Sequence, residues 1–215
     1  GISMQQFYND YVNHFKTPPT SILEIGSRDG NHAEHLRQLA DISHDSVFLV
    51  EPHPTSFKTM IAAHPKFTSF QLAISDKPGV VDFNAIPDIY NIHVMGTSSL
   101  LSVDDPNNPY YPPATWIKVL AITGETLLQL INRFELDLVK IDVEGLTYEV
   151  LKSFGYGIRH LKALHLEVEV APFKIWKNQH SYQEIHTYMT QWGFKETHFH
   201  FSYGGQGDNV WMRID

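Results

Sequence analysis

Two pairs of polar side chains stand at the ends of apolar runs, where they could accept or donate a proton. Asp142 and Glu144 follow one such run, and His165 and Glu167 lie two residues apart in another. Carboxylates and imidazoles are common general acids and bases in enzymes. We rank Asp142 first, as a base or as a group that positions a hydroxyl, with Glu144, His165 and Glu167 behind it.

These residues also have structural explanations. Asp142 and Glu144 could cap a helix expected from Gly145, where negative charge is favoured. His165 could be a hydrogen-bonded core histidine. The carboxylates could hold Mg²⁺ or Ca²⁺, but no ligand spacing in the sequence requires it, so no metal site is predicted.

Other charged and imidazole side chains carry less information. Lys140 lies in an otherwise apolar run, and burying it unpaired would be costly, so we expect a carboxylate partner. The pairs His32/His35 and His198/His200 have no accompanying ligand set. We interpret them as surface or packing residues.

A glycine turn follows the first apolar run. The segment Glu24-Ile25-Gly26-Ser27-Arg28-Asp29-Gly30 places its two glycines four residues apart. This differs from the dinucleotide motif G-x-G-x-x-G, in which helix-end amides hold a pyrophosphate. S-adenosylmethionine has no phosphate, and its ammonium suits an acidic residue such as Glu24. We therefore expect Glu24, Gly26, Ser27 and Gly30 to bind S-adenosylmethionine.

Residues at the ends of the second and third apolar runs could bind a nucleoside. Glu51 comes 25 residues after Gly26, and a carboxylate there can accept hydrogen bonds from both ribose hydroxyls. The third run leads into Ser75 and Asp76, either of which could bind the amino edge of adenine. Each feature alone could be a turn or a solvated strand end. Together, on successive strands, they indicate a cofactor site.

Short β-type runs alternate with helical segments along the chain. We expect strands at 21–25, 47–50, 67–74, 80–84, 117–122, 136–141, 161–170, 194–203 and 210–214, and helices at 31–40, 55–63, 124–133, 145–154 and 181–192. Thr123 is a predicted helix cap, and residues 204–207 a predicted hairpin turn. The alternation predicts an α/β fold of the Rossmann-like methyltransferase type: a doubly wound, mostly parallel sheet with a C-terminal antiparallel hairpin.

The length of 215 residues predicts a single domain over 1–215. Residues 85–115 contain five prolines and break the alternation, so we expect a long loop or lid there. Its aromatic side chains could cover an acceptor or form a homodimer contact. Residues 1–3 before Met4 are interpreted as a cloning remnant and left out of the fold prediction.

Composition excludes several classes of function. The chain has no cysteine, which removes disulfides and thiolate chemistry, and its net charge is −8, from 16 basic and 24 acidic residues. This charge argues against a broad nucleic-acid surface. No apolar run is long enough to span a membrane, and no signal peptide is visible. We expect a cytoplasmic protein.

The segment Leu138 to Gly145, with the sequence L-V-K-I-D-V-E-G, resembles the K-I-D-V-E-G motif of the FkbM family of methyltransferases. In that family the motif precedes a helix with the pattern E-x-x-L, and here the motif is followed by Glu149-Val150-Leu151, in which the two residues are one position closer. The resemblance continues at 23–30, 50–52, 73–76, 97–100, 119–128 and 166–168. It covers about residues 20 to 170, and its K-I-D-V-E-G match is quite specific.

The resemblance implies a methyltransferase that uses S-adenosylmethionine and methylates a hydroxyl of a small-molecule acceptor, commonly a sugar, lipid or natural product. One departure lies after Gly145, where members often have an acidic residue closer to the glycine than Glu149. Two alternatives stay open. One is a nucleotide-dependent oxidoreductase, disfavoured by the absent G-x-G-x-x-G, and the other is a binding module of the same fold without turnover.

Overall fold

The computed structural model describes residues 1–85, 115–170, 180–202 and 205–215, so the predicted loop or lid over 85–115 lies almost entirely outside the described residues. The helices are α1 (Met4–Phe15), α2 (Asn31–Ala40), α3 (Pro54–Ala63), α5 (Gly124–Ile131), α6 (Thr147–Ser153) and α7 (Tyr182–Gln191), with 3-10 helices η1 (His44–Ser46) and η2 (Gly155–His160). The strands are β1 (Ile22–Ile25), β2 (Val47–Val50), β3 (Thr68–Phe70), β4 (Ala73–Ile74), β5 (Gly79–Asn84), β6 (Trp116–Ile122), β7 (Leu136–Ile141), β8 (Leu161–Glu169), β9 (Phe194–Ser202) and β10 (Gln206–Arg213). Within the described ranges, no helix has both the length and the apolar character that crossing a bilayer requires.

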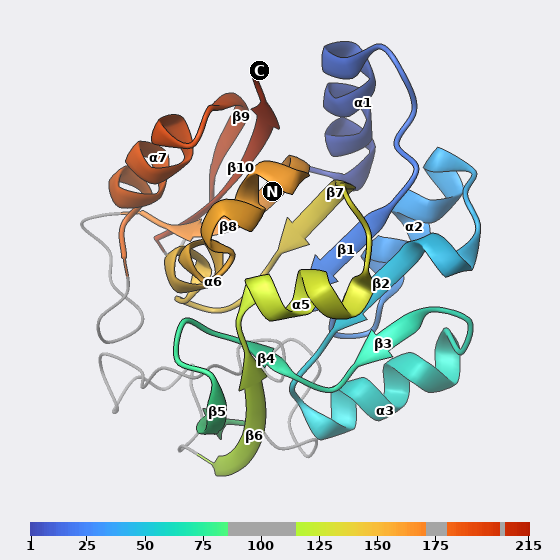
Figure 1. Ribbon diagram of the computed structural model, residues 1–215, viewed down its shortest axis with the longest axis vertical. Coiled ribbons are helices and arrows are strands. Elements are labelled where there is room, and N and C mark those ends of the chain that lie inside the picture. Colours follow the sequence, from blue (N-terminus) through green and yellow to red (C-terminus); the bar gives the residue numbers. More distant parts are fainter. Residues whose placement is uncertain (86–114, 171–179, 203–204) are drawn as a thin grey trace.

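The main sheet has seven strands in the order β3-β2-β1-β7-β8-β10-β9 (Figure 1). Strands β3, β2, β1, β7 and β8 pair in parallel, and β10 pairs antiparallel with both β8 and β9. This confirms the predicted doubly wound sheet with its C-terminal hairpin. The strand order reverses between β1 and β7, and ligands of such sheets bind beyond the carboxyl ends of the strands at this reversal.

Helices cover both faces of the main sheet. On one face α5, α6 and α7 pack through side chains such as Leu127 and Ile185. On the other face α1, α2 and α3 pack through side chains such as Phe7, Leu36 and Met60. Burying each of these large apolar side chains stabilises the fold by about 1.5–3 kcal/mol, so the two layers hold the strand ends in place.

Helix α1 was not predicted, and its N-terminal end lies against the end of the main sheet. Ser3 caps the helix by accepting the backbone N–H of Gln6. The backbone N–H of Ile2 donates to Asp208 Oδ2 at 2.8 Å. The buried residues of α1 are Met4, Phe7, Asp10 and Tyr11. Residues 1–3, which were left out of the fold prediction, therefore contact the rest of the fold, and the apolar residues at helical spacing from Met4 were the available signal for α1.

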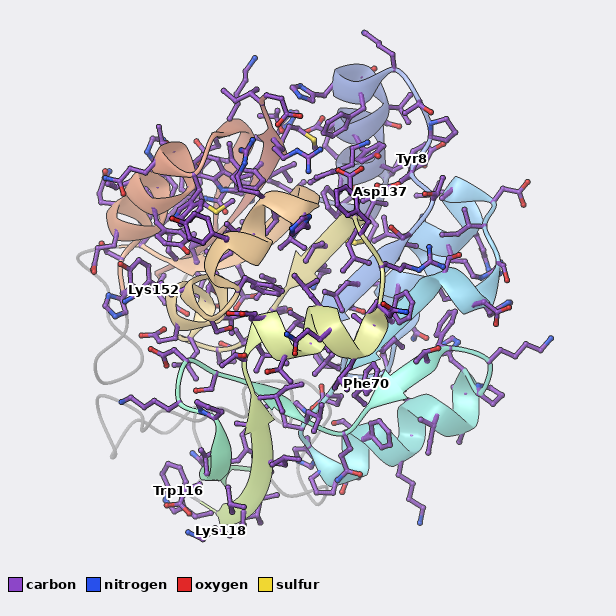
Figure 2. All side chains as sticks on the ribbon, viewed as in Figure 1. Tyr8, Phe70, Trp116, Lys118, Asp137 and Lys152 are labelled. Carbon is purple, nitrogen blue, oxygen red and sulfur yellow. The ribbon has the colours of Figure 1, made fainter. Side chains whose placement is uncertain are left out.

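The prediction of a single strand over 67–74 is wrong, because this segment divides between two sheets. β3 pairs with β2, and the backbone N–H of Glu51 makes the last bond of that pairing to the Phe70 carbonyl, at 3.1 Å. Because β2 ends at Val50, it does not pair with residues after Phe70. β4 instead pairs with β6 in a three-stranded sheet of order β4-β6-β5. Figure 2 places Trp116 and Lys118, at the tip of β6, far from Tyr8 and Asp137 at the other end of the molecule.

The last strand begins at Gln206, so the predicted turn over 204–207 extends too far and the predicted strand start at Val210 is wrong. Gly207 lies in the ladder, because β8 and β9 pair with this segment from both sides. The longer strand places Gln206 opposite Glu169 and Asp208 opposite Glu167. Two polar residues are thereby added to the carboxyl end of β8.

Thr123 caps α5 as predicted, since its hydroxyl oxygen accepts the backbone N–H of Thr126 at 3.1 Å. We expect Thr123→Ala to lower the free energy of unfolding by about 1 kcal/mol, because one N–H of the first turn loses its acceptor. Urea denaturation followed by circular dichroism measures this change. Thr55→Ala, inside the first turn of α3 rather than at its cap, serves as the control, and an equal loss in both variants would contradict the role of Thr123.

Candidate active site

Gly26 lets the end of β1 lie directly against the end of β7. Its φ is 81°, a left-handed conformation, and a Cβ at this position would lie 2.0 Å from the carbonyl oxygen of Asp142. No other residue fits at that separation. The backbone N–H of Asp142 donates to the carbonyl oxygen of Ile25 at 2.9 Å. The glycine turn and the Asp142 segment are therefore one packed unit.

Glu51 joins the end of β2 to the same turn. Its Oε1 accepts the backbone N–H of Arg28 and its Oε2 accepts that of His53, both at 2.8 Å. The side chain is 5% exposed, and burial raises the pKa of Glu51 to about 7 despite these hydrogen bonds. Arg28 itself has a positive φ of 52°, so the turn is held in a strained form. The carboxylate thus lies beside the glycine turn, with further lone pairs on both oxygens.

Two predicted cofactor residues serve the turn itself. The Ser27 hydroxyl is buried against the Val50 carbonyl oxygen and Met60 Sδ, at 3.3 and 3.0 Å. Gly30 has a φ of 78° and packs against Met60 and Leu49 at the start of α2. The Ser27 side chain therefore contacts the core, and Gly30 provides the conformation that begins the helix.

Ser75 and Asp76 are positioned by the small sheet, since they follow β4. The Ser75 backbone N–H donates to the Ile122 carbonyl oxygen, and its hydroxyl accepts the backbone N–H of Lys77 at 3.0 Å. The charge of Asp76 helps to raise the pKa of Glu149 on α6, after the burial of that carboxyl. Their role toward adenine stays a prediction.

Lys140 has two carboxylate partners, which confirms that prediction. Its Nζ lies 3.3 Å from Asp142 Oδ2 and 3.5 Å from Glu24 Oε2. Burial alone would lower the pKa of Lys140, but the charges of Asp142 and Glu24 raise it above its ordinary value. Burial likewise favours the neutral form of Asp142, but mainly the charge of Lys140 holds the pKa of Asp142 below its ordinary value. The charge of Lys140 therefore favours the ionised form of Asp142, which is the form that can accept a proton.

Glu24 is the more deeply buried partner of Lys140. It is 2% exposed, and burial raises the pKa of Glu24 to about 7, with the charge of Lys140 offsetting only part of the effect. Its Oε1 is buried with no hydrogen-bond partner in the described part of the chain. An orphaned carboxylate oxygen beside a glycine turn fits the ammonium of an amino-acid cofactor.

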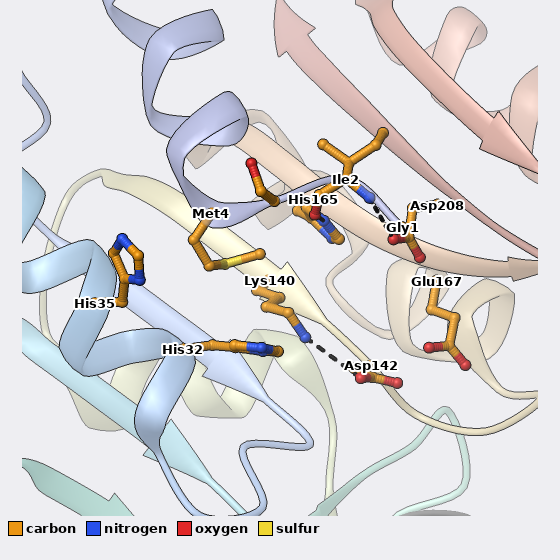
Figure 3. Close-up of a pocket in the computed structure, with 11 residues that line it drawn as sticks. Gly1, Ile2, Met4, His32, His35, Lys140, Asp142, His165, Glu167 and Asp208 are labelled. Carbon is orange, nitrogen blue, oxygen red and sulfur yellow. Dashed lines mark hydrogen bonds and ion pairs between the residues drawn. The ribbon is translucent and has the colours of Figure 1, made fainter. Parts of the chain in front are cut away.

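A cavity of about 420 Å³ opens on the face of the sheet that α1 and α2 cover (Figure 3). Lys140, Asp142 and His165 line it, together with the polar side chains of Glu167, Asp208, His32 and His35, and residues 1–4. Asp142 and Glu167 reach into it from the ends of β7 and β8. The cavity is bordered by a potential base and is large enough to hold part of an acceptor.

Three histidines line this cavity. His32 and His35 are exposed, in keeping with their interpretation as surface residues, and both border the cavity. His32 Nδ1 lies 3.9 Å from Glu24 Oε2. His165 Nε2 contacts the Ile2 carbonyl oxygen at 2.9 Å. Burial lowers the pKa values of both His165 and His32, so both rings are neutral near pH 7.

Glu144 and Glu167 lie beside Asp142. Burial, followed by the charge of Asp142, raises the pKa of Glu144 to about 8 and that of Glu167 well above its ordinary value. Gly145, with a φ of 76°, turns the chain between β7 and α6. Helix α6 has Leu146 as its N-cap, without a side-chain capping bond, so the structure gives no support to the helix-cap explanation of these carboxylates.

The sequence interpretation missed Glu169 and Gln206 in this group. Gln206 Nε2 lies 3.0 Å from Glu144 Oε2, 3.1 Å from Glu167 Oε1 and 3.4 Å from Glu169 Oε1. Glu169 had an available signal, since it is two residues after Glu167 and alternation places both on one face. Gln206 had none, because the segment was interpreted as a turn.

The raised pKa of Glu51 predicts how nucleoside affinity depends on pH. The ionised carboxylate accepts ribose hydroxyls, so affinity should fall as pH drops below about 7, by up to about tenfold per pH unit. 5′-Methylthioadenosine is the probe, because it has the ribose without a group that titrates between pH 5.5 and 8.5. Calorimetry with 2′,3′-dideoxyadenosine should give weaker binding without this slope. A dissociation constant that does not change with pH would refute the role of Glu51.

Taken together as hydrogen-bond acceptors, Glu24 and Glu51 fit S-adenosylmethionine. Glu24 Oε1 is an unpartnered acceptor for an ammonium, and Glu51 retains acceptor capacity for hydroxyls. Both lie beside the Gly26 turn, at the point where the strand order reverses. The fold and these two acceptors therefore indicate the same class of cofactor.

Comparisons with known proteins give the family. The sequence profile described as "Methyltransferase FkbM domain" matches residues 24–196, whereas no curated protein matches the chain. The structure of methyltransferase FkbM from Methylobacillus flagellatus is 9% identical, with a TM-score of 0.55, over 90% of this chain and 43% of that one. Magnesium protoporphyrin IX methyltransferase from Synechocystis with bound S-adenosylmethionine is 10% identical with a TM-score of 0.52, over 98% of this chain and 78% of that one. TrmK from M. capricolum with S-adenosylhomocysteine is 9% identical with a TM-score of 0.52, over 96% of this chain and 66% of that one.

At these identities the solved structures show the fold, and the family match shows the family. The oxidoreductase alternative is therefore wrong. Because the matched segment covers well over half of the residues, the chain belongs to the FkbM family of S-adenosylmethionine-dependent methyltransferases.

Proposed function

We propose that this methyltransferase transfers the methyl group to a hydroxyl of a small-molecule acceptor, such as a sugar, a lipid or a natural product. The observation that carries the proposal is Asp142, a carboxylate of lowered pKa that faces a cavity of about 420 Å³. A hydroxyl must give up its proton as it accepts a methyl group, and a positioned carboxylate can receive that proton.

The residues around Asp142 divide the work of the site. When bound, S-adenosylmethionine supplies a methyl group that its sulfonium has already activated. The charge of Lys140, whose Nζ is 3.3 Å from Asp142 Oδ2, favours the ionised form of Asp142, whereas burial and the charge of Asp142 raise the pKa values of Glu144 and Glu167. Of these three, Asp142 is therefore the carboxylate that we assign as the proton acceptor, and holding the acceptor alcohol against it supplies much of the rate.

On the cofactor side, Glu24 and Glu51 would bind the two ends of the molecule. Glu24 Oε1 would accept from the ammonium, and Glu51 would accept from the ribose hydroxyls. Gly26 keeps the space between them free of a side chain. Gly30 and Ser27 would act through the shape of the turn, and Ser75 or Asp76 would contact adenine.

Calorimetry and an acceptor screen test the proposal. S-adenosylhomocysteine should bind with a stoichiometry of one, and NAD should not bind. Incubation with S-adenosylmethionine across sugars and polyketide alcohols should yield S-adenosylhomocysteine and a methyl ether. Methylation of an amine or a carboxylate, with no alcohol accepted, would overturn the hydroxyl assignment. Binding without transfer to any acceptor would favour the alternative of a binding module without turnover.

A further inference from the structure

Three carboxylates meet around the Gln206 amide and a fourth, Asp142, adjoins two of them, so we call Asp142, Glu144, Glu167 and Glu169 the carboxylate cluster. One oxygen from each of Asp142, Glu144 and Glu167 lies within 4.8 Å of the others. Gln206 Nε2 is within 3.4 Å of oxygens from Glu144, Glu167 and Glu169. A primary amide has two N–H groups, so it cannot satisfy three carboxylates at once.

Glu169 provides an independent sign that a ligand belongs here. Its side chain is 4% exposed, and its Oε2 is buried without a hydrogen bond of ordinary geometry among the described residues, although the Gly145 backbone N–H is near enough to lower the pKa of the carboxyl. Alternation along β8 places Glu169 on the same face as Glu167, and Gln206 lies opposite it in β10. A buried carboxylate oxygen left without a donor is destabilising, and the other oxygen of Glu169 shares the Gln206 amide with Glu144 and Glu167.

Charge around the cluster is poorly balanced. Lys140 is the cation in contact with Asp142, and it is shared with Glu24. His165 and His32, which face the same cavity, have lowered pKa values and so add little positive charge near pH 7. Among the described residues, Arg28 adds only a smaller contribution at Asp142 than Lys140 does, so protons or a bound cation would offset the remaining negative charge.

The chemistry and spacing of the donors favour a cation. Hard divalent ions take carboxylate oxygens, with distances of about 2.3–2.6 Å for Ca²⁺. Two oxygens on opposite sides of such an ion are then about 5 Å apart, so a spacing within 4.8 Å allows one ion to contact all three carboxylates. The smaller Mg²⁺ would require the oxygens to move closer together.

We propose that Asp142, Glu144 and Glu167 bind one divalent cation of the size of Ca²⁺ or Mn²⁺, with Glu169 as a further oxygen donor. This departs from the sequence prediction, which has no metal site. An ion at this position would lower the pKa of a hydroxyl bound to it. That consequence rests on the proposed hydroxyl acceptor, whereas the binding site itself does not.

Calorimetry on the full chain, stripped with EDTA and exchanged into EDTA-free buffer at pH 7.5, tests the site. Titration with CaCl₂ and MnCl₂ should give one site with a dissociation constant below about 1 mM. Glu144→Gln and Glu167→Gln should each weaken binding at least tenfold. Asp208→Asn, which removes a charge from the same cavity but not from the cluster, should change affinity less than threefold.

Thermal unfolding is a second measurement, and it distinguishes a variant that has lost the metal site from one that fails to fold. In EDTA, Glu167→Gln should unfold at a higher temperature than the wild type, because the wild type must either protonate Glu167 or bury its charge beside Asp142, and the amide avoids both costs. Adding 5 mM CaCl₂ should raise the unfolding temperature of the wild type and leave Glu167→Gln unchanged.

Two outcomes would overturn the proposal: no binding of either ion at 10 mM, or equal affinity in wild type and both glutamine variants. The measurements need neither cofactor nor acceptor. If hydroxyl methylation were not observed, the cation-binding measurements would still be valid. Loss of the metal site would not alter S-adenosylhomocysteine binding.

Discussion

Asp142→Asn should reduce the methyl-transfer rate by about 10²–10⁴-fold, the usual contribution of a general base, while S-adenosylhomocysteine affinity stays within about threefold. The amide keeps the size of the side chain but cannot take up a proton. The charge of Lys140 holds the pKa of Asp142 below its ordinary value, so the wild-type rate should not decline through loss of this base between pH 7 and pH 5. S-adenosylhomocysteine formation with an alcohol from the screen measures the rate.

Asp82→Asn is the matched control, because Asp82 pairs with Lys118 in the small sheet, away from the cavity. It should retain the wild-type rate. Full activity in Asp142→Asn would refute the assignment of this residue as the base. A parallel loss of S-adenosylhomocysteine affinity would instead place Asp142 in cofactor binding.

Lys140→Met should lower the free energy of unfolding by about 3–5 kcal/mol at pH 8, as expected when one partner of a buried ion pair is removed. Glu24 and Asp142 would lose the ammonium at 3.5 and 3.3 Å. The pKa of Glu24 is already raised to about 7 by burial, and it should rise further in this variant. Urea unfolding in EDTA at pH 5 and pH 8 measures the effect.

The sign of the pH dependence follows from proton binding. A carboxyl of the unfolded chain ionises near pH 4.3, whereas Glu24 in the folded variant would keep its proton beyond pH 7. The folded state then binds more protons, so stability falls as pH rises across this interval. The deficit relative to wild type should therefore be larger at pH 8 than at pH 5.

Lys152→Met removes an exposed lysine of α6 that lies over the Tyr148 ring. It should cost well under 1 kcal/mol, since exposed charges contribute little. If Lys140→Met lost no more stability than this control, or lost the same amount at both pH values, the Lys140–Glu24 pair would not hold the strand ends together.

Much of the cofactor half of the site could be inferred from the order of residues along the chain. The ends of parallel strands meet at one edge of the sheet, so Gly26, Glu51 and Asp142 could be expected to converge without knowing any contact. The structure places the Glu51 carboxylate on the Arg28 backbone N–H and the Gly26 turn against the Asp142 carbonyl. The same reasoning predicted a partner for Lys140, because an unpaired buried ammonium is too costly.

The cavity proposed to hold the acceptor is formed by packing between distant segments. Helix α1 and Ile2 reach the end of the sheet through contacts to His165 and Asp208, which are more than 160 residues away. No local periodicity encodes such a contact. The division of 67–74 between two sheets likewise followed from where β2 ends, which is a property of its partner strand.

The sequence by itself therefore determined the sheet, its terminal hairpin and the residues at its central strand ends, because hydrophobic periodicity and strand direction are local properties. Only the tertiary structure decided which of the carboxyl groups have raised or lowered pKa values, and that Glu169 and Gln206 join them. The pKa of a carboxyl depends on its burial and on neighbouring charges, and those are set by segments that meet only when the chain folds.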